Sequence, residues 1–284
     1  MIHKLLTAAT VVAAAIVAAA FGAVETRSNG AADASREAGR FVWCDLMTKD
    51  VSAAKRFYGD LLGWRFEDAK RGDLPYVLAR AGTEVVGGIV DVTSLANAGA
   101  QWLSFLSVED VDRAVTVVES DGGNVLVPPR NGALARVAVV ADPQGAPLGL
   151  AQLRRDVPDP LEPAPHHFFW QEYLARDANQ ALSFYKRLAG YDSAILETRL
   201  GVDYHLLRTT RPRAGLFTLP PTVVDVQPNW LPYVLVDDPA ALAARVQGLG
   251  GRVLVPAAPE RRNGSLVVIA DPGGAVLALQ KYPF

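Results

Sequence analysis

A few side chains are of types that can carry chemistry. Asp45 and Glu172 are carboxylates within short apolar segments, and His205 lies in the segment VDYHLLR. A carboxylate can act as a general base or bind a substrate hydroxyl, and an imidazole can transfer a proton or bind a metal ion. Each also has a structural alternative, because buried carboxylates pair with arginines or cap loops and a strand histidine is often a hydrogen-bonded core or edge residue. The catalytic residues are therefore unknown, and Asp45, Glu172 and His205 are the candidates.

The rest of the composition excludes several kinds of chemistry. Cys44 is the only cysteine, so neither an intramolecular disulfide nor a Cys-based zinc site can form. The chain has four histidines among its 284 residues, which limits any metal site. It contains no Gly-x-Ser-x-Gly elbow, phosphate loop or dinucleotide fingerprint. The net charge of −2 without a basic stripe does not indicate a nucleic-acid partner.

An internal repeat organises the chain at an offset of 127 residues. Residues 41–67 and 168–194 both open with Phe-x-Trp and continue to a Phe-Tyr pair and a glycine. The segment GGNVLVP matches GGRVLVP, and ADPQGAPLGL matches ADPGGAVLAL. The first eight identical positions are Phe41, Trp43, Asp50, Ala54, Phe57, Tyr58, Leu61 and Gly63, which recur as Phe168, Trp170, Asp177, Ala181, Phe184, Tyr185, Leu188 and Gly190. The chain therefore holds two homologous domains.

Each repeat is predicted to contain two βαβββ units. In the first repeat, residues 41–47 have the character of a strand, and Asp50 stands where an N-cap would begin a helix. Apolar residues then recur at helical spacing until Gly63, which is typical of a C-cap. Three strands follow, and residues 102–153 repeat the order strand, helix and three strands. The fold class is therefore α+β.

The N-terminus has the parts of a secretory signal. Lys4 precedes an apolar stretch, and small residues follow, with cleavage expected after Ala20, Gly22 or Ala23. The stretch is also long enough to stay as a membrane anchor. The protein is thus expected to be exported to the periplasm or the extracellular space, or anchored to the cytoplasmic membrane.

Five segments follow from these patterns. The linkers are assigned from their polar and proline-rich composition. The segments are a signal peptide or membrane anchor at 1–23, a disordered linker at 24–40, a first domain at 41–154, a Pro-rich linker at 155–166, and a second domain at 167–284.

The motifs resemble those of the vicinal oxygen chelate family, which includes glyoxalases, bleomycin-resistance proteins and extradiol dioxygenases. A strand, an aspartate and a helix ending in Phe-Tyr-x-x-x-x-Gly open each repeat, and Asp-Pro-x-Gly introduces its closing strand. The resemblance covers nearly everything from 41 to 284. It implies two tandem domains, in each of which two βαβββ units form a half-open barrel around a ligand cavity. It leaves open whether the domains pair within one chain or in a homodimer.

The resemblance also implies a divalent metal, but its usual ligands are missing. The ligand on the first strand falls on Trp43 or Trp170, and the one on the fifth strand falls near Leu103 or Leu231. The glutamate of the last strand falls on Leu148 or Gly149 in the first copy, and on Leu277 or Ala278 in the second. No cofactor is therefore expected, although a site using Glu172 and His205 would be an unusual alternative.

A small-molecule ligand is the expected partner. Trp43, Trp102, Trp170 and Trp230 are candidate cavity walls, and they would suit a flat, apolar or cationic ligand. Equally, they would serve as core filler between sheet and helices. The sequence thus favours a metal-independent binding protein. The alternatives are a glyoxalase-type lyase, isomerase or dioxygenase with an unusual ligand set, or a structural role.

Overall fold

The computed structural model describes residues 34–35, 37–71, 74–96, 98–132, 134–199 and 202–282. The expected signal peptide or anchor at 1–23 and the linker residues 24–33 lie outside these described residues. Within the described part, no helix is both long and apolar enough to cross a membrane.

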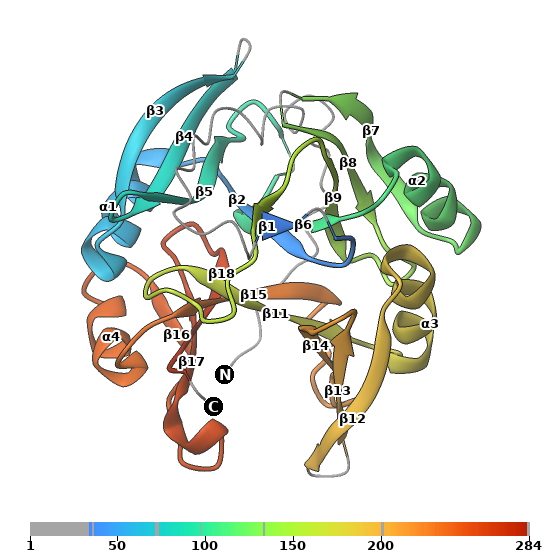
Figure 1. Cartoon of the computed structure of the whole chain (residues 1–284). Helices are drawn as coiled ribbons and strands as arrows, with labels where there is room; N and C mark the ends of the chain where they lie inside the picture. Colours follow the sequence, from blue (N-terminus) through green and yellow to red (C-terminus); the bar gives the residue numbers. More distant parts are fainter. Residues whose placement is uncertain are drawn as a thin grey trace. The chain divides into compact units, whose positions relative to one another are not determined.

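The first repeat folds into one mixed eight-stranded sheet and two helices (Figure 1). The strand order is β3-β4-β5-β2-β6-β9-β8-β7, so the sheet is open, with β3 and β7 at its edges. β2 pairs in parallel with β5, and β6 pairs in parallel with β9. The elements are β2 (Phe41–Thr48), α1 (Val51–Leu62), β3 (Arg65–Arg71), β4 (Leu74–Ala81), β5 (Glu84–Asp91), β6 (Gln101–Ser107), α2 (Val111–Ser120), β7 (Asn124–Asn131), β8 (Ala135–Ala141) and β9 (Pro147–Leu153).

The second repeat forms an equivalent sheet with the order β12-β13-β14-β11-β15-β18-β17-β16. Its elements are β11 (Phe168–Ala175), α3 (Ala178–Ala189), β12 (Asp192–Arg199), β13 (Val202–Arg208), β14 (Pro212–Thr218), β15 (Asn229–Leu235), α4 (Pro239–Val246), β16 (Arg252–Val255), the short 3₁₀ helix η2 (Arg262–Gly264), β17 (Leu266–Ala270) and β18 (Val276–Gln280). The predicted α+β class with two βαβββ units in each repeat is confirmed.

The helix ends form as the sequence predicts. The Asp50 side chain accepts a hydrogen bond of 2.8 Å from the Ala53 N–H, and Gly63 ends α1 in the left-handed conformation with φ of 69°. Asp177 and Gly190 do the same for α3. Short polar caps and glycine satisfy backbone groups that a helix end leaves without intrahelical partners.

The chain packs into two compact units that do not coincide with the two repeats. One unit comprises residues up to Trp43 together with Leu103–Asp159 and Trp170–Trp230. The other comprises Cys44–Trp102, Pro160–Phe169 and Leu231–Phe284. Each compact unit thus contains one βαβββ unit from each repeat. Helix α2 lies beside α3 in the first compact unit, and α1 lies beside α4 in the second (Figure 1).

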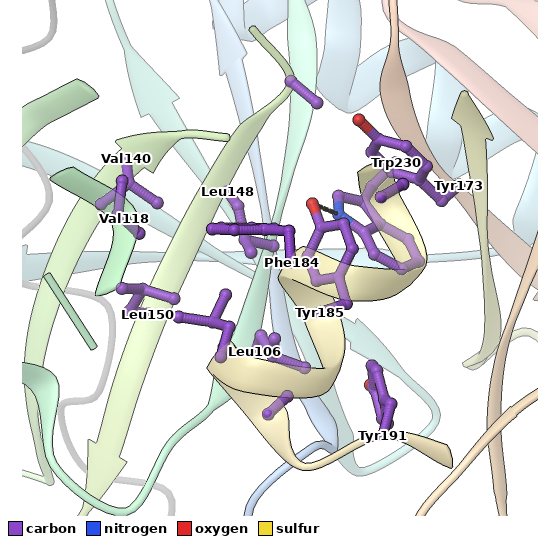
Figure 2. Packing of buried hydrophobic residues seen from close by; sticks show 14 of the residues in the cluster. Leu106, Val118, Val140, Leu148, Leu150, Tyr173, Phe184, Tyr185, Tyr191 and Trp230 are labelled. Atoms are coloured by element: carbon purple, nitrogen blue, oxygen red, sulfur yellow. Dashed lines mark hydrogen bonds between the residues drawn. The ribbon is translucent and has the colours of Figure 1, made fainter. Parts of the chain in front are cut away.

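A buried aspartate links the two repeats within the first unit. Asp142, from the Asp-Pro-x-Gly turn of the first repeat, accepts hydrogen bonds from the Tyr173 and Tyr185 hydroxyls at 2.5 and 2.8 Å. Both tyrosines belong to the second repeat. The Trp230 indole N–H in turn donates to the Tyr185 hydroxyl at 2.8 Å, as Figure 2 shows. These polar groups join the two repeats within an apolar cluster that includes Phe184, Leu148 and Leu150.

The second unit repeats this arrangement with the roles of the repeats exchanged. Asp271, from the Asp-Pro-x-Gly turn of the second repeat, accepts a hydrogen bond of 3.2 Å from Tyr58 of the first. The Trp102 N–H donates to the Tyr58 hydroxyl at 2.9 Å. Each of these polar atoms is buried and hydrogen-bonded, as the folded state requires.

Burial determines the protonation of these groups. It raises the pKa of Tyr58 and of Tyr185 well above the usual value, and the neighbouring Asp271 and Asp142 carboxyl groups add to the rise. The tyrosines therefore stay protonated and donate. Burial also raises the pKa of Asp142, although its donors, Tyr173 first among them, act in the opposite direction.

The structure describes residues 34–35 and 37–40 of the first linker, and the disorder predicted over 24–40 does not extend to them. β1 (Ala34–Ser35) pairs with β10 (Val157–Pro158). The Arg40 side chain is 5% exposed, donates to the Pro158 carbonyl at 2.6 Å and forms an ion pair with Asp159 at 3.4 Å. Glu37 forms an ion pair with Arg213. The charged residues Glu37 and Arg40 thus belong to a partly buried charge cluster with Asp159 and Arg213.

We expect Tyr185→Phe to lower the free energy of unfolding by about 2–4 kcal/mol, because it removes a donor to Asp142 and leaves the buried Trp230 N–H without its acceptor. Tyr58→Phe should act similarly through Asp271 and Trp102. Chemical denaturation measures both. Tyr282→Phe, at a residue that is 47% exposed, is the control and should change little. Equal small effects of all three variants would contradict a joining role for the buried tyrosines.

Candidate ligand-binding face

Strand alternation assigns the two sides of each sheet. Cys44 and Leu46 belong to an apolar cluster that includes α1 residues, so Trp43, Asp45 and Met47 lie on the other side of β2. We call this other side the carboxylate face. In the first repeat it carries Asp45, and in the second it carries Glu172.

On this face, the positions that match the family's metal ligands hold residues whose side chains cannot bind a metal ion. In the first repeat they are Trp43, Leu103 and Gly149, because Leu148 and Leu150 point into the apolar cluster. The alternation thus selects Gly149 over Leu148 for the position of the glutamate.

Gly149 lacks the room for any side chain. It pairs with Phe105 on the neighbouring strand, and a Cβ atom on Gly149 would lie 2.3 Å from the Phe105 ring. The ring, which is fully buried, occupies the place where a glutamate would start. The first repeat therefore does not fit a metal held in the family's way.

The second repeat also lacks metal-binding side chains at the positions of the family's ligands. Leu277 and Leu279 belong to the apolar cluster, so Ala278 lies on the carboxylate face, where it pairs with Tyr233. The family's other two ligand positions, on the first and fifth strands of this repeat, hold Trp170 and Leu231. Among the described residues, no three His, Cys, Asp or Glu side chains come together as a metal site would require. The expectation of a metal-independent protein stays a prediction.

Asp45 and Tyr76 form a buried pair in the first repeat. The Tyr76 hydroxyl donates to Asp45 Oδ1 at 2.5 Å. Tyr76 is 4% exposed and Asp45 is 2% exposed. Gly88, which pairs with Asp45, makes this contact possible, because a Cβ atom there would lie 1.6 Å from the Tyr76 hydroxyl. Sequence reasoning missed Tyr76 and Gly88 as part of this site.

Glu172, Tyr204 and Gly215 occupy the equivalent positions in the second repeat. Glu172 is 5% exposed and pairs with Gly215, across which the Tyr204 ring lies. A Cβ atom on Gly215 would be 1.9 Å from the Tyr204 hydroxyl. The Trp170 indole N–H donates to that hydroxyl at 3.2 Å. The signal that could have found these tyrosines was their recurrence near the repeat offset, together with a glycine inside a strand.

His205 does not join this group. It pairs with Leu216, a residue of the apolar cluster, whereas Glu172 pairs with Gly215. Because consecutive residues of a strand point to opposite sides, the imidazole and the Glu172 carboxylate lie on opposite faces of the sheet. The geometry gives no support to a metal site made from these two residues.

The four tryptophans predicted as candidate cavity walls separate into two pairs. Trp102 and Trp230 are 6% and 4% exposed and belong to the apolar clusters, where their N–H groups bind Tyr58 and Tyr185. This is the core-filling alternative. Trp43 and Trp170 are half-buried and lie on the carboxylate face. Only the second pair is placed where a ligand on that face would meet it.

The tandem βαβββ architecture defines a class of protein, and comparisons with known proteins agree with it. A model described as the Glyoxalase/Bleomycin resistance protein/Dioxygenase superfamily matches residues 40–150. CFP32 of Mycobacterium tuberculosis, which carries the name of a glyoxylase, is 33% identical over 244 residues, covering 84% of this chain and 93% of that protein. The chain belongs to the glyoxalase/bleomycin resistance protein/dioxygenase superfamily.

Other relatives and structures are more distant. The anthracycline biosynthesis protein DnrV of Streptomyces peucetius is 29% identical over 254 residues, covering 82% of this chain and 90% of that protein. A homoprotocatechuate 2,3-dioxygenase variant from B. fuscum has a TM-score of 0.60 at 15% identity, covering 90% of this chain and 74% of that one. The Mn(II)-bound glyoxalase from Novosphingobium aromaticivorans has a TM-score of 0.56 at 15% identity, covering 86% and 82%. The two structures share the fold with this chain.

We expect Gly88→Ala to destabilise the protein by about 2–4 kcal/mol, because its methyl group would displace the Tyr76 hydroxyl from Asp45. Tyr76→Ala should cost less stability in the Gly88→Ala background than in wild type, because it removes the ring with which the new methyl group clashes. Gly59→Ala is the control: a Cβ there would meet its nearest atoms at 3.5 and 3.6 Å, so helix propensity should stabilise α1 by up to about 1 kcal/mol. Thermal or chemical unfolding measures all three. Independent, additive effects of the Gly88 and Tyr76 substitutions would refute the coupling.

Proposed function

We propose that this chain is an exported member of the superfamily that binds a small apolar or aromatic molecule on a carboxylate face without a metal ion. The observation that carries the proposal is the chemistry of the positions that match the family's ligands: Trp43, Leu103, Gly149, Trp170, Leu231 and Ala278. A site without metal donors but with indole and aliphatic surfaces gains affinity from apolar contact, not from oxygen chelation.

One relative supports an aromatic ligand. DnrV carries the name of an anthracycline biosynthesis protein, and the chain covers 90% of its length. Anthracyclines are fused-ring aromatic compounds, which is the shape that half-buried indole rings accommodate best. Export rests on the apolar segment between Leu5 and Ala23 and on the small residues at its end.

An enzyme of the glyoxalase type is the second candidate, favoured by the name of CFP32 and by the buried carboxylates Asp45 and Glu172. A metal-dependent lyase, isomerase or dioxygenase would need a ligand set other than the family's own. The described residues provide no cluster of three such donors. The binding function therefore takes precedence.

The test uses the full-length gene expressed in a bacterial host. Mass spectrometry of the chain from the periplasmic or extracellular fraction should show an N-terminus just after residue 20, 22 or 23. Titration of that protein with a hydroxylated anthraquinone, followed by tryptophan fluorescence and calorimetry, should give saturable binding with a Kd of about 1–100 μM.

Binding should be unchanged by a chelator, and an aliphatic alcohol of similar size is the control that should not bind. A requirement for added Mn(II), Fe(II), Ni(II) or Zn(II) would refute metal independence, and an intact Met1 on cytoplasmic protein would refute export.

A further inference from the structure

The carboxylate faces of the two repeats differ in how far they are covered. Four equivalent positions near the carboxylate show this difference. In the first repeat they are all buried, with exposed fractions between 2% and 6%: Met47, Tyr76, Leu78 and Val90. In the second repeat the equivalent residues are all half-buried: Leu174, Tyr204, Leu206 and Phe217. The first face is therefore closed around Asp45, with Trp43 half-buried at the start of the strand, whereas the second presents partly exposed aromatic and aliphatic surface around Glu172.

The tyrosines beside the two carboxylates differ in exposure in the same sense. In the first repeat, the Tyr76 hydroxyl donates its proton to Asp45 at 2.5 Å within a buried pair that a ligand cannot reach. In the second repeat, Tyr204 and Trp170 form a half-buried pair, in which the hydroxyl accepts the indole N–H at 3.2 Å. A ligand that reaches this half-buried hydroxyl can exchange hydrogen bonds with it, because a tyrosine hydroxyl both donates and accepts. Glu172 occupies the position equivalent to Asp45, and its side chain is longer by one methylene group.

We propose that the second repeat holds the ligand-binding site, centred on Trp170, Glu172 and Tyr204, and that the equivalent region around Asp45 in the first repeat is a closed structural copy. The ligand class is a neutral, flat aromatic compound that carries a hydroxyl or keto oxygen at its edge. The inference rests on the proposed function and adds to it the location of the site and the polar feature it recognises.

The chemistry of the three residues selects this class. The indole of Trp170 and the ring of Phe217 provide aromatic surface for a flat ligand. The Tyr204 hydroxyl can donate to a keto oxygen or accept from a hydroxyl group, and a carboxylate such as Glu172 binds a hydroxyl as an acceptor. An anionic ligand would be repelled by the nearly buried Glu172 carboxylate, which is 5% exposed.

The experiment compares matched substitutions in the two repeats of the full chain. A hydroxylated anthraquinone and anthracene, which has no polar oxygen, are titrated against wild type, Tyr204→Phe, Glu172→Gln, Tyr76→Phe and Asp45→Asn. Tyr204→Phe should weaken binding of the anthraquinone about tenfold, because one hydrogen bond is lost, and leave that of anthracene within about twofold. Glu172→Gln should weaken the anthraquinone about threefold to tenfold.

The first-repeat variants should keep the anthraquinone affinity within about twofold of wild type, even where they lower the thermal stability. An unchanged affinity of Tyr204→Phe and Glu172→Gln, with wild type still binding, would overturn this inference and leave the proposed function intact. An equal loss in Tyr76→Phe would overturn it as well. If neither compound binds wild-type protein, the proposed function fails and the inference fails with it.

Discussion

The hydrogen bonds of two buried aspartates are the interaction on which the architecture depends. Asp142 and Asp271 each stand in the Asp-Pro-x-Gly turn of one repeat and accept a tyrosine hydroxyl from the other repeat. A buried carboxyl group without such donors would cost several kcal/mol, so these pairings select which βαβββ units pack together. The motifs that identify the family therefore have a structural role here: they join units from different repeats.

Because these contacts occupy the buried side of each sheet, the carboxylate faces remain for function. Trp102 and Trp230 are committed to the apolar clusters through their bonds to Tyr58 and Tyr185, so they contribute to stability. The carboxylate faces lie on the other side of each sheet from Trp102, Tyr173 and Trp230, so they can diverge without disturbing these contacts. Gly149 beneath the Phe105 ring leaves no room for the glutamate that the family's metal site would need at this position.

The sequence predicted the local structure well, because local signals determine it. Asp50 and Gly63 begin and end α1 as their capping preferences indicate, and the repeat revealed the second domain from the first. Partners distant in the chain were not predictable. Tyr58 and Asp271 are 213 positions apart, and nothing local indicates that they meet. Likewise, the charges of the first linker indicated disorder, whereas in the folded chain Arg40 and Glu37 pair with Asp159 and Arg213.

The central claim is that the protein binds its ligand without a metal ion, and metal analysis of the purified mature protein tests it most directly. Protein prepared without chelator, from cells supplied with manganese, iron, nickel and zinc, is measured by mass spectrometry of its metal content. We expect a folded chain with far less than one equivalent of any of these metals. One equivalent of a single metal, lost in Glu172→Gln, would contradict metal-independent binding and favour a glyoxalase or dioxygenase reaction at that carboxylate.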